Sequence, residues 1–171
     1  GSPGCCARFG SEGVEMSSRI KKLLELTESI QQIPAPGFEE EPRANFVKSL
    51  FEKEDLKRVS SDEIHNVFAC LPGKGSGKPL VISAHLDTVF PIDTNLTVVR
   101  QADRIRGPGI GDNSLGVASL FGLIWSIRER NITLPGDLWL VANVGEEGLG
   151  DLRGMRAVVN RFGANIQAYL V

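Results

Sequence analysis

Two apolar runs separated by a long apolar helical pattern constrain the fold of this chain most. Residues 79–84 (PLVISA) and 138–144 (LWLVANV) are almost uninterrupted apolar runs, as in strands covered on both faces. Residues 114–130 between them are apolar nearly all round, which predicts a deeply packed helix. A further helix in 151–163 and a strand in 164–171 continue the alternation. The order predicts an α/β fold with a mixed, mostly parallel sheet flanked by helices.

The first half of the chain predicts two helices followed by short strands. Residues 17–33 place apolar side chains near one helical face, and a second helix opens at the acidic run 39–41. We expect that run to be solvated rather than to bind a cation. Residues 55–62 and 63–72 alternate as edge or half-exposed strands do, and residues 95–107 predict a small hairpin.

The length of 171 residues fits one domain with its own hydrophobic core. We assign residues 16–171 to that domain, because Met16 is a candidate natural start. Residues 1–15 (GSPGCCARFGSEGVE) lack a charged segment followed by an apolar one, so they do not resemble a signal peptide. We expect them to be a tag or a disordered leader.

Charge and cysteine content exclude several kinds of partner. The formal net charge is −2, so the chain has neither a basic field for nucleic acid nor a polybasic face for a membrane. No apolar stretch is expected to be long enough to cross a bilayer. The cysteines Cys5, Cys6 and Cys70 cannot build a disulfide framework or a cysteine-rich zinc site. We therefore expect a cytoplasmic protein with no nucleic-acid and no membrane partner.

Polar side chains that could carry chemistry follow three elements of the predicted sheet. His85 and Asp87 follow the first apolar strand, Asp112 lies in a glycine-rich turn, and Glu146 and Glu147 follow the second apolar strand. Taken singly, each has an ordinary structural explanation: a structural histidine, a helix cap, or a solvated loop. In an open α/β sheet, however, the carboxyl ends of the strands form the ligand site, so these groups should converge.

A metal ion would explain that convergence. Four carboxylates and an imidazole at one sheet edge would repel one another and lose hydration, and a cation relieves both costs. Imidazole and carboxylate are suitable zinc ligands. Asp87 can accept a hydrogen bond from the non-ligating nitrogen of His85 and fix its tautomer. Of the adjacent glutamates, one can bind metal while the other accepts a proton from water.

Three segments resemble the motifs of the di-zinc exopeptidase family, which includes peptidase T, carboxypeptidase G, aminoacylase and succinyl-diaminopimelate desuccinylase. They are AHLDTVFP (84–91), GPGIGDNSLGVA (107–118) and NVGEEGLGDLRG (143–154). The resemblance implies that His85 binds one zinc, Glu147 binds the other, and Asp112 bridges both. It implies that Asp87 orients His85 and that Glu146 is the general base. It also implies a cis peptide bond after Asp112.

The same resemblance implies that residues 16–171 form only part of a catalytic domain. Relatives have a lid or dimerisation domain and a C-terminal part with further metal ligands, which are absent here. The intact enzyme would bind two Zn²⁺, or Co²⁺ or Mn²⁺ in their place, and would hydrolyse a peptide or an N-acyl amino acid. It could be a homodimer, and a peptidase T-like aminopeptidase is the favoured activity. With two ligands left for each zinc, we expect this chain to bind metal weakly or not at all and to have little activity.

The alternative hypothesis is a non-catalytic, metal-free binding module that uses the same sheet edge, with the helix N-terminus near Ser114 holding an anion.

Two phosphate-binding motifs are excluded. Residues 72–79 (PGKGSGKP) do not fit the G-x-x-x-x-G-K-[ST] phosphate loop, because Pro72 stands in place of the first glycine and Pro79 follows Lys78. Ser114 occupies the third glycine position of a dinucleotide fingerprint.

Overall fold

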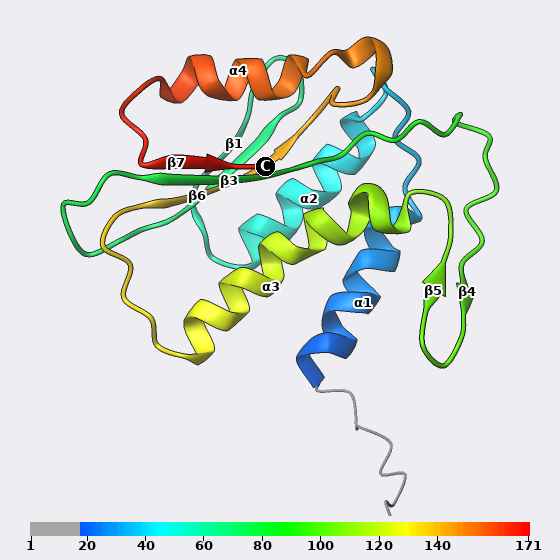
Figure 1. Cartoon of the computed structure of the whole chain (residues 1–171), viewed down its shortest axis with the longest axis horizontal. Helices are drawn as coiled ribbons and strands as arrows, with labels where there is room; N and C mark the ends of the chain where they lie inside the picture. Colours follow the sequence, from blue (N-terminus) through cyan, green and yellow to red (C-terminus); the bar gives the residue numbers. More distant parts are fainter. Residues whose placement is uncertain (1–17) are drawn as a thin grey trace, which may run out of the picture.

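A five-stranded mixed sheet forms the centre of the structure (Figure 1). This computed structural model describes residues 18–171, so the expected tag or leader at residues 1–15 lies outside the described residues. The strand order is β1-β2-β6-β3-β7. The strands are β1 (Lys57–Ser61), β2 (Val67–Leu71), β3 (Leu80–His85), β6 (Leu138–Asn143) and β7 (Ala168–Leu170). Strand β2 is antiparallel to β1 and β6, and the other pairs are parallel, so β2 alone among these five strands runs the opposite way.

Helices cover both faces of this sheet, and Figure 1 shows α4 on one side and α1, α2 and α3 on the other. The helices are α1 (Ser18–Gln31), α2 (Glu41–Lys53), α3 (Leu115–Glu129) and α4 (Arg153–Phe162). The larger core lies between the sheet and the three helices, where the Phe51 and Phe121 rings stack at 4.8 Å. The smaller core lies under α4 and includes Phe68, Trp139 and Val158. The predicted α/β class with a mixed sheet is confirmed.

Strands β3 and β6 are central because their sequences are apolar on both faces. Every residue of β6 is buried, and β6 pairs with β2 on one side and β3 on the other. The hairpin predicted in residues 95–107 is present as β4 (Val99–Arg100) and β5 (Ile105–Arg106), which pair outside the main sheet. Short strands and a charged sequence explain its position at the surface.

Three expectations from the sequence are wrong in detail. The strand within residues 63–72 is not half-exposed, because β2 lies between β1 and β6 and its first four residues are fully buried. His65 lies in the turn between β1 and β2 rather than in a strand. The acidic run is not fully solvated, because Glu40 is only 1% exposed.

The absence of a membrane-length segment is also not confirmed. One helical stretch among residues 18–171, Ile110–Glu129, has the length and apolar composition of a membrane-spanning helix. This is weak evidence, since core helices have the same composition. Its α-helical part is α3, which packs against α1 and β3, and the backbone is non-helical at Asp112 and Asn113.

Candidate metal centre

The carboxyl ends of β3 and β6 bring His85 and two glutamates together. In the parallel register of these strands, His85 lies opposite Asn143, so the segments that follow both strands leave the sheet at the same edge. Glu146 and Glu147 follow β6 directly. One ligand atom from each of His85, Glu146 and Glu147 lies within 4.8 Å of the other two, a spacing that suits one metal ion.

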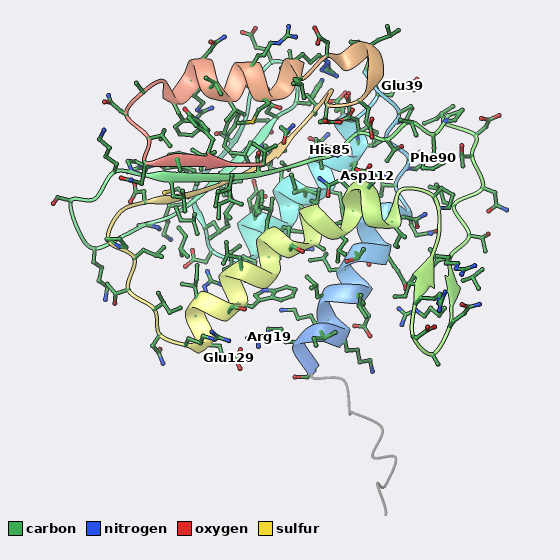
Figure 2. The ribbon with its side chains drawn as sticks, viewed as in Figure 1. Arg19, Glu39, His85, Phe90, Asp112 and Glu129 are labelled. Carbon is green, nitrogen blue, oxygen red and sulfur yellow. The ribbon has the colours of Figure 1, made fainter. Side chains whose placement is uncertain are left out.

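Asp112 reaches this group from the turn before α3. Its Oδ1 lies 3.0 Å from Nε2 of His85, and Figure 2 shows the two residues beside each other. The peptide bond between Asp112 and Asn113 is cis, as the family resemblance implied. The alternative function of Asp112 as a helix cap is not seen, since among the described residues no side-chain hydrogen bond caps α3. The Asp112 side chain is 77% exposed, which leaves it accessible to a ligand.

Asp87 lies beneath these residues and organises them. It is fully buried, and its two carboxylate oxygens accept hydrogen bonds from the main-chain N–H groups of Glu146 (3.0 Å) and Glu147 (2.8 Å). The Nδ1 atom of His85 lies 3.1 Å from the main-chain oxygen of Asp87 and 3.7 Å from its Oδ1. The predicted partners lie next to each other, but the hydrogen bond from His85 goes to the main-chain oxygen of Asp87, and the carboxylate lies within ion-pair distance only.

Two charged residues of the α2 region support this arrangement, and the sequence did not indicate either. The buried Glu40 carboxylate accepts hydrogen bonds from the main-chain N–H of Gly145 (3.1 Å) and from the Arg153 guanidinium (2.6 Å). Arg43, only 2% exposed, donates to the main-chain oxygens of Ile33 (2.8 and 2.5 Å) and Leu86 (2.7 Å). Arg43 thus joins the end of α1 to the residue between His85 and Asp87.

Burial and neighbouring charges alter the protonation of the site. Burial lowers the pKa of His85, but Asp87 and, more weakly, Glu146 raise it, so that the pKa lies above its ordinary value. Burial raises the pKa of Asp87, but hydrogen bonds from His85 and from two main-chain N–H groups lower it, and the pKa lies below its ordinary value. Burial raises the pKa of Glu147, and the negative charges of Glu146 and Asp112 raise it further. A cation would relieve this repulsion.

We expect the metal-free chain to show a His85 pKa above 6.5, the ordinary value of the side chain. The chain has two histidines, so an NMR titration of the imidazole signals is simple to assign with His65→Gln as the reference variant. Because the folded-state pKa is raised, the stabilisation from His85 is complete below about pH 6.5 and is lost as the pH rises through the folded-state value. A midpoint at or below 6.5 would contradict the hydrogen-bonded arrangement with Asp87.

The residues present fit a divalent metal ion. With Nδ1 of His85 held by Asp87, Nε2 is the nitrogen left to bind metal, in the arrangement common for metal-binding histidines. One imidazole and several carboxylates within a few ångströms are suitable ligands for zinc and related ions. The structure therefore brings all five predicted residues together, and the role of each stays a prediction. The geometry groups Glu146 with Glu147 and does not distinguish ligand from base.

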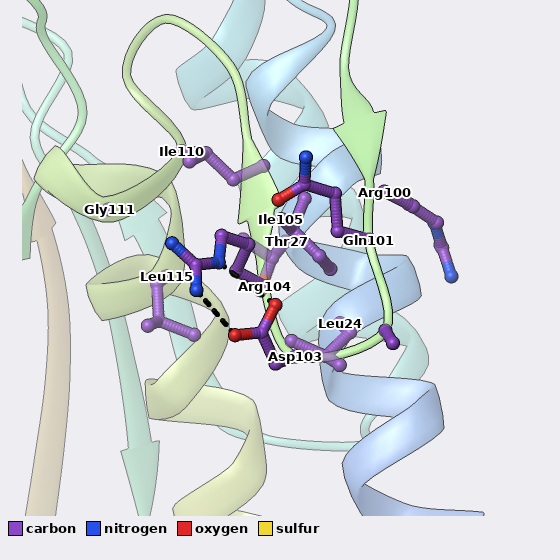
Figure 3. A pocket seen from close by; sticks show the side chains of 11 residues that line it. Leu24, Thr27, Arg100, Gln101, Asp103, Arg104, Ile105, Ile110, Gly111 and Leu115 are labelled. Atoms are coloured by element: carbon purple, nitrogen blue, oxygen red, sulfur yellow. Dashed lines mark hydrogen bonds and ion pairs between the residues drawn. The ribbon is translucent and has the colours of Figure 1, made fainter.

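A cavity of about 400 Å³ lies elsewhere, between the β4–β5 hairpin, α1 and the turn before α3 (Figure 3). Leu24, Ile105 and Leu115 line it, together with the ion pair between Asp103 and Arg104. None of the five candidate residues lines this cavity. Its charged groups are all in ion pairs, Asp103 with Arg104 and Arg100 with Glu28, so it does not compete with the strand ends as the candidate site.

A mixed α/β sheet that gathers an imidazole and carboxylates at its strand ends has the architecture and the donor set of an α/β metal-dependent enzyme. The chain belongs to peptidase family M28, whose sequence profile matches residues 66–170. It is also 32% identical over 149 residues to a peptidase M20 domain-containing protein of Schizosaccharomyces pombe, covering 84% of this chain and 36% of that protein. The resemblance to the exopeptidase family is confirmed.

Other relatives extend the same picture. A probable succinyl-diaminopimelate desuccinylase of Staphylococcus aureus is 25% identical over 134 residues, covering 74% of this chain and 33% of that protein. The fold is shared with aminopeptidase PepT of Bacillus cereus (TM-score 0.69, 23% identity, 80% of this chain and 39% of that chain). It is also shared with YxeP of Bacillus subtilis, described as a dinuclear metal-binding peptidase of the M20 family (TM-score 0.66, 18% identity, 88% of this chain and 42% of that chain). This chain spans about a third of the length of the curated relatives.

Proposed function

We propose that this chain carries part of the active site of a metallopeptidase that hydrolyses a peptide or N-acyl amide bond, with a peptidase T-like aminopeptidase favoured. One observation carries the proposal: His85, Glu146 and Glu147 offer ligand atoms within 4.8 Å of one another, with Asp112 in contact with His85. Membership of a peptidase family supports the hydrolytic reaction. The relatives named as peptidases and a desuccinylase favour catalysis over a non-catalytic binding module.

The metal would be held by His85, Asp112 and Glu147, as a pair of zinc ions or of Co²⁺ or Mn²⁺. When bound, such ions lower the pKa of water and polarise the carbonyl of the substrate. Asp87 holds Nδ1 of His85 and keeps Nε2 directed at Asp112. Glu146 is the proposed general base, which takes a proton from the attacking water and passes it to the leaving nitrogen. Asp87 fixes the main chain of Glu146, so the base is held in position.

The substrate would be a peptide or an N-acyl amino acid, bound in the cytoplasm by a protein that could act as a homodimer. The relatives named as an aminopeptidase and a desuccinylase support such substrates. A sequence without a disulfide framework supports the compartment. The chain spans about a third of the length of the curated relatives, so turnover should be measured in the longest available version of the protein.

We expect Glu146→Gln and Glu147→Gln to have different effects in the full-length protein. Removing the general base should lower kcat by at least about 100-fold with metal content unchanged. Removing a ligand should lower metal content measured by atomic emission, and activity should recover in part at high metal concentration. Glu63→Gln, at an exposed turn position, is the matched control. Unchanged turnover in both site variants would contradict the roles proposed for Glu146 and Glu147, and absence of turnover in the wild-type protein would favour the binding module.

The 171-residue chain itself is expected to bind zinc weakly. Two ions would share three side chains, His85, Asp112 and Glu147, so each ion would have two protein ligands, whereas a catalytic zinc normally has three. Isothermal titration with ZnCl₂ should give a dissociation constant of about 1 μM or weaker. Tight binding of two equivalents would show that this ligand set is sufficient.

A further inference from the structure

An apolar groove opens directly beside the candidate metal centre. It has a volume of about 370 Å³ and is lined by three loops, residues 36–38, 88–91 and 147–150. Glu147 belongs both to this lining and to the group of candidate ligands. We call it the Phe38 groove. Its position means that a molecule held at the metal centre would place neighbouring groups in it.

The Phe38 groove exposes large apolar side chains that a folded protein normally covers. Phe38 is 63% exposed, Val89 is 66% exposed and Leu149 is 92% exposed. Phe90, labelled in Figure 2, lines the groove as well. Contiguous apolar surface of this kind marks a site of interaction. Because the groove is concave and joins the centre through Glu147, its occupant should be part of the molecule that the centre acts on.

The wall formed by Phe38 is held in place by an ion pair between the half-buried Arg153 and the buried Glu40. The Phe38 backbone has φ 74°, a conformation that bulky residues rarely adopt. The Arg153 guanidinium lies 4.6 Å from the centre of the Phe38 ring, and it is bound in turn by the buried carboxylate of Glu40. Glu40 also accepts the main-chain N–H of Gly145, just before Glu146. One carboxylate thus positions both the apolar wall and the loop of the candidate base.

We propose that the Phe38 groove is the subsite for an apolar side chain next to the hydrolysed bond, so that the substrates carry a leucine- or phenylalanine-sized apolar group there. The assignment rests on the proposed hydrolytic function, since it takes the metal centre as the place of the reaction. A cavity of about 150 Å³ already accommodates benzene, so the volume of the groove suffices for either side chain. Arg153 is paired with Glu40 and faces the Phe38 ring, which makes this wall a poor partner for an acidic side chain.

The test measures binding of two uncharged probes, N-acetyl-leucinamide and N-acetyl-glycinamide, to the 171-residue chain by methyl NMR. The probes differ only in the side chain, and both lack charged ends. We expect N-acetyl-leucinamide to shift the methyl signals of Val89 and Leu149 in a saturable way, with or without EDTA. N-acetyl-glycinamide should bind at least tenfold more weakly. Failure of the proposed function would appear separately, in the metal and turnover measurements on the glutamate variants.

Two variants and one control localise the preference. Leu149→Asn changes a side chain that is 92% exposed, and Phe38→Asn keeps a residue type that tolerates positive φ, so both should fold. Each is expected to reduce the leucine preference at least fivefold. Leu152→Asn, at a 45% exposed leucine outside the groove, should leave it unchanged.

Three results would overturn the assignment. Equal binding of the two probes would show that the groove does not select an apolar side chain. A leucine preference that survives both Leu149→Asn and Phe38→Asn would place the binding elsewhere. Light scattering would show whether these variants lose self-association. If they do, and the preference for N-acetyl-leucinamide over N-acetyl-glycinamide does not change, the groove is an interface between copies of the chain.

Discussion

Asp87→Asn is expected to reduce the free energy of unfolding by about 2–4 kcal/mol and metal affinity in the full-length protein by about 10–100-fold. The wild-type carboxylate accepts one main-chain N–H on each oxygen, at 3.0 and 2.8 Å. An asparagine side chain has only one acceptor oxygen, so its NH₂ group would face one of these donors in a fully buried position. The substitution also removes the negative charge beside His85.

Urea unfolding of the 171-residue chain and isothermal titration of the full-length protein measure these two effects. Asp93→Asn is the matched control, because Asp93 is exposed and lies in the segment that follows the same strand. A loss of less than about 0.5 kcal/mol, the range of ordinary surface substitutions, would show that Asp87 does not organise the glutamate loop. An unaltered metal affinity would show that the Asp87 carboxylate does not help to position His85, whose Nδ1 keeps its contact with the main-chain oxygen of residue 87.

Arg43→Met is expected to cost about 3–5 kcal/mol, because it breaks a buried charged network from one side. The main-chain oxygens of Ile33 and Leu86 would lose their charged donor, and Asp87 would lose a nearby cation. Burial lowers the pKa of Arg43 to about 10, against the opposing influence of Asp87, so the guanidinium is charged at neutral pH. Methionine fills a similar volume, so the loss reports the polar contacts.

Thermal and urea unfolding measure this loss, with Arg130→Met at an exposed position as the control. Arg43→Lys should recover only part of the stability, because a single ammonium cannot reach the Ile33 and Leu86 oxygens as the planar guanidinium does. Full recovery by lysine would mean that the charge matters and the branched geometry does not. A methionine variant as stable as the wild type would contradict the network altogether.

Local patterns in the sequence predict the central strands, the long helix and the three segments that carry the candidate polar side chains. Strands β3 and β6 are almost uninterrupted apolar runs, and α3 is apolar on nearly all sides. The need to bury these side chains therefore fixes where the three elements lie in the fold. The convergence of His85 with Glu146 follows from a general property of parallel strands, whose carboxyl ends share an edge.

Contacts between distant residues could not be predicted in the same way. Glu40 looked like part of a solvated helix start, because nothing near it in the chain indicates Arg153, 113 positions away. Arg43 reaches Leu86 across 43 positions. The burial of β2 also depends on a partner strand, β6, that comes much later in the chain. In each case the tertiary environment overrides a local pattern that is itself unremarkable.

Three successive main-chain N–H groups donate hydrogen bonds to two carboxylates. Glu40 accepts from Gly145, and Asp87 accepts from Glu146 and Glu147. These carboxylates come from the start of α2 and the end of β3, so the loop acquires its shape only when helix and sheet have docked. Hydrogen exchange at the three amides should then be as slow as in the core strands. The reactive loop would open only with global unfolding, and a partly folded chain would carry no half-formed centre.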